Sequence, residues 1–212
     1  MTTRKLSGNR IIDYGMGNLA SVRRAFEEVG GRVIVSDQPS TLKEVSHIVL
    51  PGVGSFADGM ANLNRGGWVT ALRDAVLDKH LPLLGICLGM QLLAEHGVEG
   101  GETDGLGFIP GRVERLVPDS PTTRIPHVGW NEVYQKCPNL LLDGIPDGTD
   151  FYFVHSFRLF PDDRTTVIGI TPYCGEFPSV VMKGSVFGTQ FHPEKSQPVG
   201  FRVLRNFLQN IL

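Results

Sequence analysis

A short stretch in the first half of the chain carries a strand signal, a sharp turn and a helix signal in direct succession. It runs from Leu83 to Leu93, where an apolar segment crosses Gly-x-Cys-x-Gly and continues as an apolar helical pattern. This is the layout of a nucleophile elbow with Cys in the Ser position. Gly85 and Gly89 leave room for a tight turn that side chains would obstruct. The stretch therefore predicts a strand, a turn and a helix that begins at Cys87.

Two interpretations of Cys87 are open on this stretch alone. A helix N-terminus offers free N–H groups and the positive end of the helix dipole, which favour a thiolate and a neighbouring oxyanion. The alternative is a small buried cysteine behind a strand, which is the usual fate of a free cysteine. The rest of the chain has to decide between them.

Length and composition set the class of protein. With 212 residues, 41% hydrophobic and 20% charged, the chain should fold around one core as a single domain, residues 1–212. The net charge of −2 argues against nucleic acid as the main partner. Three widely spaced cysteines fit neither a disulfide framework nor a zinc site. The polar N-terminus and the lack of a membrane-length apolar run predict a cytoplasmic protein that does not enter a membrane.

Apolar runs and helical patterns alternate through the first half of the chain. Asn18 fits a helix N-cap, and the first ten residues are predicted to be frayed. Because Asn9 and Arg10 suit a buried strand poorly, the first strand is predicted to be short or atypical. The predicted strands are 11–14, 32–36, 47–50 and one from 82, and the predicted helices are 19–29, 41–45 and 59–77 with a break near 66–67.

This alternation predicts a parallel sheet with helices on both faces. Sites in such sheets lie at the carboxyl ends of the strands, so Asp13, Gly52 and Cys87 can converge there. The glycines near Gly15 lack the third glycine of a dinucleotide loop, and the loop 51–56 lacks the Lys-Ser/Thr of a P-loop. No cofactor is expected.

The second half of the chain has a different composition, with many Gly and Pro residues between short apolar stretches. These read as antiparallel strands packed on the first half, followed by a closing helix at 198–212. The fold class is therefore α/β, with a mostly parallel central sheet flanked by helices and additional antiparallel strands in the C-terminal half. The predicted strands are 108–109, 112–117, 129–134, 150–157, 165–171, 179–183 and 186–191.

A second group of polar residues follows the last predicted strand. His192 and Glu194 stand two apart in extended chain, so both can face the same way. A His near Cys87 can act as its base, and a carboxylate behind the His fixes its tautomer and stabilises the imidazolium. Taken alone, the segment 192–194 would be interpreted as a common surface turn. Together with the Cys elbow and the flexible glycine loop 51–54, each at a predicted strand end, it favours a catalytic triad.

These motifs resemble those of a known family. Gly-Ile-Cys-Leu-Gly-Met-Gln at 85–91 and Gln-Phe-His-Pro-Glu-Lys-Ser at 190–196 are similar to the motifs of class I (triad) glutamine amidotransferases. The stretches 12–19, 51–54, 127–131 and 152–156 further resemble the glutaminase subunit of imidazole glycerol phosphate synthase. The resemblance runs from about Ile11 to Leu212 and implies the class I glutamine amidotransferase fold.

The resemblance implies a role for each matching residue. The cysteine of this family attacks the carboxamide carbon of glutamine, expels ammonia and leaves a glutamyl thioester that water hydrolyses. Cys87 would be the nucleophile, His192 the general base and then acid, and Glu194 the residue that orients His192. The oxyanion hole would use Leu88 and, after a peptide rotation, Val53 or Gly54; glutamine would be held by Gly52, Gln91, His155 and Ser156.

The same resemblance implies a partner. A (β/α)₈ cyclase barrel would dock over the site as the other half of a heterodimer, receive the ammonia and make imidazole glycerol phosphate and AICAR for histidine synthesis. Asn18 and Trp130 match positions at this docking face. The alternative interpretation is purely structural, with Asn18 as a helix N-cap and Trp130 as a core aromatic. Asn9-Arg10, Val128 and Phe157 depart from the family pattern.

Three alternatives stay open. A paralogue could feed ammonia to a sugar amidotransferase in surface-polysaccharide synthesis. A regulatory subunit could bind its partner without hydrolysing anything, although the intact Cys87, His192 and Glu194 argue against that. A peptidase is disfavoured because nothing suggests a peptide groove. His127 and His155 lack further ligands at suitable spacing, so no metal is expected.

Overall fold

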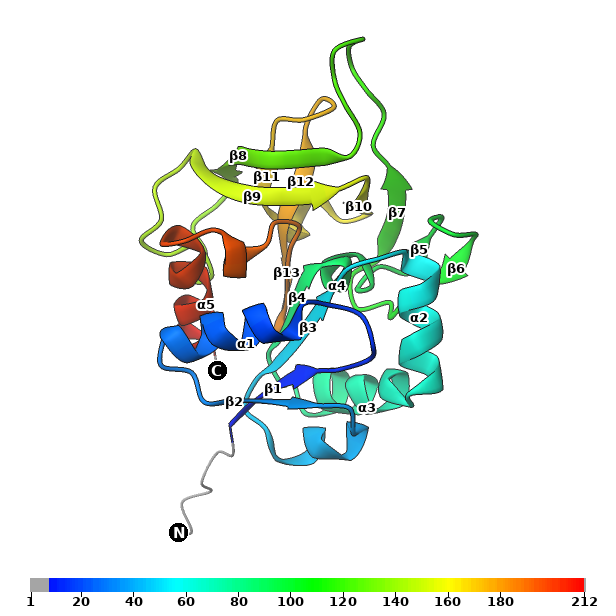
Figure 1. Cartoon of the computed structure of the whole chain (residues 1–212), viewed down its shortest axis with the longest axis vertical. Coiled ribbons are helices and arrows are strands. Elements are labelled where there is room, and N and C mark those ends of the chain that lie inside the picture. The colour runs from blue at the N-terminus through cyan, green and yellow to red at the C-terminus, as the bar shows by residue number, and fades with distance from the viewer. Residues whose placement is uncertain (1–7, 212) are drawn as a thin grey trace.

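The computed structural model describes residues 8–211; the N-terminal residues 1–7, part of the segment predicted to be frayed, lie outside the described residues, as does Leu212. A nine-stranded sheet runs through the molecule in the order β2-β1-β3-β4-β13-β12-β11-β8-β9 (Figure 1). Its strands are β1 Asn9–Ile12, β2 Val33–Ser36, β3 Ile48–Gly52, β4 Leu83–Cys87, β8 His127–Gln135, β9 Thr149–His155, β11 Val167–Thr171, β12 Phe177–Lys183 and β13 Val186–Thr189.

A smaller sheet has the order β10-β7-β5-β6. Its strands are β5 His96–Gly97, β6 Thr103–Asp104, β7 Gly111–Arg115 and β10 Phe157–Pro161. The α-helices are α1 Leu19–Glu28, α2 Phe56–Arg65, α3 Trp68–Arg73, α4 Leu88–Gln91 and α5 Val199–Asn210. Shorter helical turns lie at Pro39–Glu44 (η1), Asp74–Asp78 (η2), Arg164–Thr166 (η3) and Pro193–Lys195 (η4).

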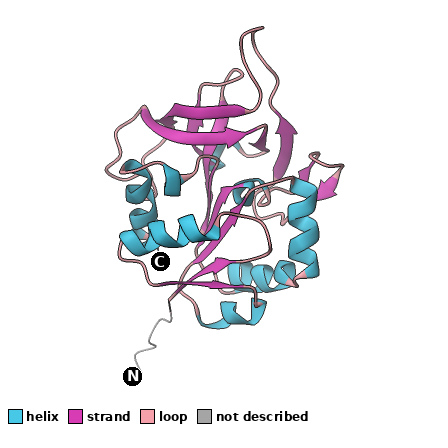
Figure 2. Ribbon diagram, in the orientation of Figure 1, coloured by secondary structure: helices cyan, strands magenta, loops and turns pink. Residues whose placement is uncertain are grey.

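Helices cover both faces of the parallel part of the sheet (Figure 2). Because successive strand residues point to opposite faces, each strand supplies two hydrophobic cores. Ile11 and Val49 pack with α1 and α5, whose buried residues include Phe26 and Phe207. On the other face Ile12, Ile48 and Leu50 pack with α2 and α3, where Trp68 is buried. The predicted fold class, an α/β protein with a mostly parallel sheet and added antiparallel strands, is confirmed.

The arrangement of the second half differs from the prediction. The strands β8, β9, β11, β12 and β13 do not pack on the first half as a separate layer but extend the main sheet edge to edge, whereas β5, β6, β7 and β10 form the smaller sheet. β13 is parallel to β4, with Thr189 opposite Ile86, and only β12, β11, β8 and β9 continue antiparallel. All four residues of β13 are buried, which suits an interior strand. The parallel pairing of β13 with β4 needs a long connection between the two strands. The hydrophobic periodicity of the second half does not predict this pairing.

Several element boundaries also differ. Residues 108–109 are not a strand, and the predicted strand 150–157 divides at Ser156 into β9 and β10, which belong to different sheets. β5 and β6 were not predicted, because two residues each are too short for a periodic pattern. The predicted strand 186–191 ends at Thr189.

The first strand begins earlier than predicted, since Asn9 and Arg10 belong to β1 and are buried. The side chain of Asn9 is hydrogen-bonded at both ends, and Arg10 reaches Thr41 O through one terminal nitrogen (3.5 Å). The Asn9 amide donates to Arg32 O (3.2 Å) and its oxygen accepts from the Ser46 hydroxyl (3.0 Å). Buried polar side chains are tolerated when they are hydrogen-bonded in this way.

The elbow forms as the pattern predicts. β4 ends at Cys87, whose φ of 53° lies in the left-handed region, and α4 follows directly. A Cβ on Gly89 would overlap the carbonyl oxygen of Leu50, and one on Gly85 would lie 2.6 Å from the carbonyl oxygen of Gly89. Both positions therefore require glycine, and the resulting close approach raises Cys87 at the carboxyl edge of the sheet.

Candidate active site

A cavity of about 210 Å³ opens beside Cys87 at the carboxyl ends of β3 and β4. It brings together residues from the elbow, the glycine loop and the β9–β10 junction. Its lining comprises Val53, Gly54, Cys87, Leu88, Gln91, Glu99, Val154, His155, Ser156 and Phe157. Seven of the twelve residues singled out from the sequence are among them, although the segments are far apart along the chain.

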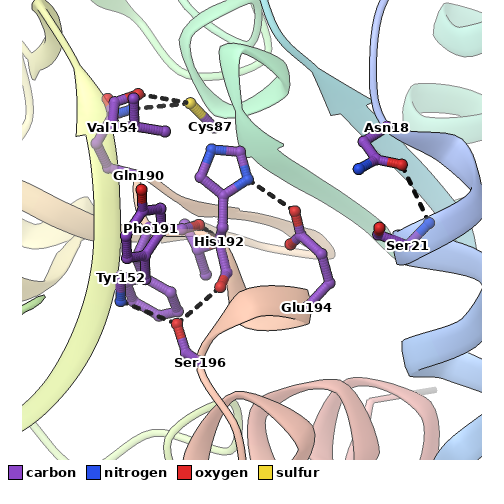
Figure 3. A network of polar contacts seen from close by, with 11 residues as sticks. Asn18, Ser21, Cys87, Tyr152, Val154, Gln190, Phe191, His192, Glu194 and Ser196 are labelled. Atoms are coloured by element: carbon purple, nitrogen blue, oxygen red, sulfur yellow. Dashed lines mark hydrogen bonds and ion pairs between the residues drawn. The ribbon is translucent and has the colours of Figure 1, made fainter. Parts of the chain in front are cut away.

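His192 and Glu194 lie behind Cys87 rather than in the cavity wall (Figure 3). His192 Nδ1 is 2.7 Å from Glu194 Oε1, and both side chains are almost fully buried. The η4 turn places the pair. The Ser196 hydroxyl donates to His192 O (2.7 Å) and accepts from Tyr152 N (2.9 Å), which ties the turn to β9.

The electrostatics of His192 favour its charged form. Burial lowers the pKa of His192, but Cys87 and Glu194 outweigh burial and raise it to about 10. Within residues 8–211, His192 Nε2 has no hydrogen-bond partner of normal geometry, so we attribute the influence of Cys87 to charge rather than to a formed hydrogen bond. At neutral pH the site therefore stabilises an imidazolium held between a sulfur and a carboxylate.

The sulfur of Cys87 has two polar neighbours. The thiol faces Val154 O at 3.8 Å, and the Gln190 amide donates to Sγ at 3.7 Å (Figure 3). Tyr14 lies close by and is buried. Burial is the main cause that raises the pKa of its phenol, and the charge of Cys87 raises this pKa further. Cys87 thus sits among groups that hold one orientation of its side chain.

The predicted oxyanion donors flank the sulfur. Leu88 is the first residue of α4, where a helix leaves its first N–H groups unpaired. Val53 and Gly54 also line the cavity, and Gly54 has a φ of +113° that favours glycine. Gly52 is the register partner of Cys87 at the end of β3, but it is not part of the cavity lining.

Gln91 is held on the cavity wall by its amide nitrogen. It donates to Phe157 O (2.9 Å) and to Gln190 Oε1 (3.1 Å). Gln190 in turn reaches Cys87, so Gln91 and the sulfur belong to one hydrogen-bonded group. Both glutamine side chains are buried, which fixes their orientation.

Three neighbours of the site were not singled out from the sequence. Glu99 lines the cavity, and burial raises the pKa of its carboxyl group, while its oxygen accepts from Phe56 N. Tyr14 and Gln190 lie within the stretches 12–19 and 190–196 that resemble the family, but no role was predicted for either side chain. Gln190 follows a strand whose pairing with β4 could not be predicted, and Glu99 lies in a loop, so neither carried a signal of its own.

The two residues assigned to a docking face lie on different elements. Asn18 is the N-cap of α1, as one interpretation predicted, and its side chain accepts from Ser21 N at 3.3 Å. Trp130 is not a core aromatic, because it is 55% exposed on β8. Its ring contacts Tyr152 of β9 edge-on, with 6.0 Å between centroids.

Two buried histidines beside the cavity give a testable pH dependence. Burial lowers the pKa of His127 to about 4, and burial together with neighbouring charges lowers that of His155 to about 3. An unfolded chain protonates both near pH 6.5. The free energy of unfolding should therefore fall as pH drops from 6.5 towards 4, by about 2 kcal/mol per histidine at pH 5.

Urea denaturation at pH 7.5 and pH 5 measures this effect. His127→Asn should remove the share of one histidine, about 2 kcal/mol, from the pH dependence, whereas the exposed His80→Gln should keep all of it. Equal pH dependence in the wild type and in His127→Asn would contradict the assignment.

No group of three or more His, Cys, Asp or Glu side chains among residues 8–211 is arranged to hold a metal ion. Across the same residues, no helix has the length and apolar character needed to cross a membrane.

Comparisons with known proteins agree with this geometry. The sequence profile of the family Glutamine amidotransferase class-I matches residues 10–211. Imidazole glycerol phosphate synthase subunit HisH of Moorella thermoacetica is 49% identical over 197 residues, covering 93% of this chain and 92% of that protein. The subunit HisH of Desulfitobacterium hafniense (strain Y51) is 48% identical over 198 residues, with the same coverage. A crystal structure of a glutamine amidotransferase superposes with a TM-score of 0.74 at 20% identity, covering 94% of this chain and 97% of the other.

Proposed function

Since this chain belongs to the class-I glutamine amidotransferase family, we propose that it hydrolyses L-glutamine to glutamate and ammonia as the glutaminase subunit of an imidazole glycerol phosphate synthase. One observation carries the proposal: a cysteine at a strained elbow faces a small cavity, with a buried His–Glu pair behind it. The whole chain, 1–212, acts as one amidotransferase domain.

The chemistry follows from the three side chains. The Cys87 thiolate attacks the carboxamide carbon of glutamine, the His192 imidazolium gives its proton to the amide nitrogen, and the C–N bond breaks to release ammonia. Water then attacks the glutamyl thioester while His192 takes a proton from it. The C–S bond breaks, glutamate leaves, and the thiolate–imidazolium pair is restored. Glu194 holds Nδ1 of His192 throughout, which fixes the tautomer.

The oxyanion of each tetrahedral intermediate is stabilised by backbone N–H groups. Leu88 supplies one from the start of α4, and the Val53–Gly54 loop supplies another once a peptide plane rotates. One such donor is typically worth roughly 3–4 kcal/mol of barrier. A loop that withholds its N–H until the partner is loaded therefore acts as a switch on glutamine hydrolysis.

The cavity recognises glutamine by its two polar ends. Gln91 and the backbone of His155 and Ser156 hold the amino acid, and the carboxylate of Glu99 suits its α-ammonium group. Gly52, which lies outside the cavity lining, reaches glutamine only after the loop peptide rotates. About 210 Å³ suffices for a single amino acid but not for a peptide. This size supports a glutaminase over a peptidase.

The ammonia needs an acceptor, because free ammonia would be protonated in water. We assign this role to a (β/α)₈ cyclase subunit that docks beside Asn18 and Trp130 to form a heterodimer in the cytoplasm and makes imidazole glycerol phosphate and AICAR for histidine biosynthesis. The exposure of Trp130 on β8 supports a docking face. The enzyme works without a cofactor or a metal ion.

Glutamate release from glutamine tests the proposal. The chain is assayed alone, with a cognate cyclase barrel, and with the barrel plus its nucleotide ligand. We expect weak activity alone and an increase of about 10²–10³-fold with the liganded barrel, the range that one oxyanion donor supplies. A rate of glutamate release that does not change when the barrel is added would point to another acceptor enzyme, such as a sugar amidotransferase. No activity in any mixture would overturn the proposed function.

A further inference from the structure

The side chain of Gln190 lies against the sulfur of Cys87 in the interior of the molecule. Its amide nitrogen is 3.7 Å from Cys87 Sγ, and the residue is fully buried (Figure 3). Its backbone N–H donates to Ser179 O (2.9 Å), which fixes the residue directly after β13. A buried amide this close to the sulfur can stabilise a charge on it, provided that the nitrogen and not the oxygen faces the sulfur.

The contacts of Gln190 determine which end of its amide faces the sulfur. Phe157 O can only accept a hydrogen bond, so the atom of Gln91 that lies 2.9 Å from it must be the amide nitrogen. The same nitrogen lies 3.1 Å from the Gln190 amide, so the Gln190 atom at this contact must be the oxygen. The nitrogen of Gln190 is therefore the end that faces Cys87, and it donates an N–H to Sγ.

Two polar groups act on the sulfur of Cys87 in opposite directions. Val154 O lies 3.8 Å from Sγ and can only accept, so it favours the protonated thiol. The N–H of Gln190 donates to the sulfur, so it favours the thiolate. A hydrogen bond to a charged acceptor is roughly twice as strong as one between neutral groups. The contact with Gln190 therefore outweighs the contact with Val154.

The titratable groups near Cys87 act on its sulfur through their charge or stay neutral. His192, paired with a buried carboxylate, supplies the positive charge, although its Nε2 has no hydrogen-bond partner among residues 8–211. Burial and then the charge of Cys87 raise the pKa of the Tyr14 phenol, which therefore stays neutral. Glu99 lines the same cavity, and burial raises the pKa of its carboxyl group. Gln190 adds to these effects a hydrogen bond donated to the sulfur itself.

We propose that Gln190 is a further catalytic residue of glutamine hydrolysis, whose amide N–H stabilises the negative charge on the Cys87 sulfur. The inference rests on the proposed glutaminase function. The sulfur is negative before it attacks glutamine and neutral in the glutamyl thioester. After water has attacked, the C–S bond breaks and its electron pair returns to the sulfur. A donor aimed at the atom where charge develops assists this step, so Gln190 should matter most for hydrolysis of the thioester.

Gln190→Met and Gln190→Leu remove the donor and keep an apolar side chain of similar size in the interior. With the liganded barrel, we expect kcat to fall about tenfold and KM for glutamine to fall as well, because the thioester accumulates when its hydrolysis is slowed. Mass spectrometry during turnover should find the glutamyl adduct on a larger fraction of the variants than of the wild type. Gln91→Met, which removes a polar group from the cavity wall, should instead raise KM. Gln135→Met, the same substitution on β8, should change neither constant.

Alkylation of Cys87 by iodoacetamide gives a readout of the thiolate that needs no catalysis. Because Cys137 is exposed and free, the measurement uses a Cys137→Ala background, and melting curves check that both variants are folded. The acid limb of the rate–pH profile should move to higher pH by about one unit in both, which is a tenfold lower rate at a given pH on that limb. An unchanged alkylation profile in the folded variants, or a higher KM without loss of kcat, would overturn the inference. A wild type that releases no glutamate would instead count against the proposed function, and the alkylation profile would still decide the role of Gln190.

Discussion

Replacing Cys87 by Ala is expected to reduce kcat for glutamine hydrolysis by roughly 10⁴-fold or more, because no other group can form the thioester. Cys87 is buried at the elbow, and the added cavity is small, so the variant should still fold. The measurements are glutamate release with the liganded barrel and the thermal melting curve. Mass spectrometry of the wild type during turnover should in addition detect the glutamyl adduct.

Cys137→Ala is the matched control for the cysteine substitution. Cys137 is exposed and free, so its loss should leave kcat and the melting temperature unchanged. Glutamine hydrolysis that persists in Cys87→Ala at more than a few per cent of the wild-type rate would exclude covalent catalysis by this residue.

Replacing Glu194 by Gln is expected to lower kcat/KM by roughly 10²–10⁴-fold. Cys87 and Glu194 together raise the pKa of His192 to about 10 against the effect of burial. Without the carboxylate, this pKa falls and the imidazolium that protonates the leaving amide nitrogen is less populated. The alkaline limb of the pH–rate profile, which marks loss of that proton, should move to lower pH by about one unit or more.

The same substitution has a stability signature of known sign. A histidine whose pKa is raised on folding contributes stability that is complete below about pH 6.5 and is lost as pH rises towards 10. Glu194→Gln should shrink that contribution. Glu27→Gln, in an exposed pair with Arg23, serves as the control for loss of a carboxylate. A pH–rate profile that keeps its alkaline limb in Glu194→Gln would refute the assigned role.

Local patterns predicted much of the fold and the main residues of the site. The elbow at Cys87 and the pair His192 and Glu194 are short motifs whose geometry depends on neighbouring residues. The helices α1 and α5 followed from apolar spacing. The nucleophile and its proposed partners could therefore be named before any contact between them was known.

Long-range pairing could not be predicted in the same way. β13 lies beside β4 because both are buried apolar strands, but nothing within Val186–Thr189 specifies that neighbour or the parallel direction. The contact of Gln190 with Cys87 depends on this register. Similarly, Asn9 and Arg10 read as poor strand residues until their partners Arg32, Ser46 and Thr41 are known.

The place of β13 in the sheet also sets the order of events during synthesis. β3 and β4 leave the ribosome early, but β13, which pairs with β4, and His192, which follows β13, lie within the last part of the chain. Cys87 thus emerges long before its proposed base. A chain that is still being made, or one broken off before residue 186, has no His192 and no β13 against β4, so we expect it not to hydrolyse glutamine. Activity therefore begins only when translation is nearly complete.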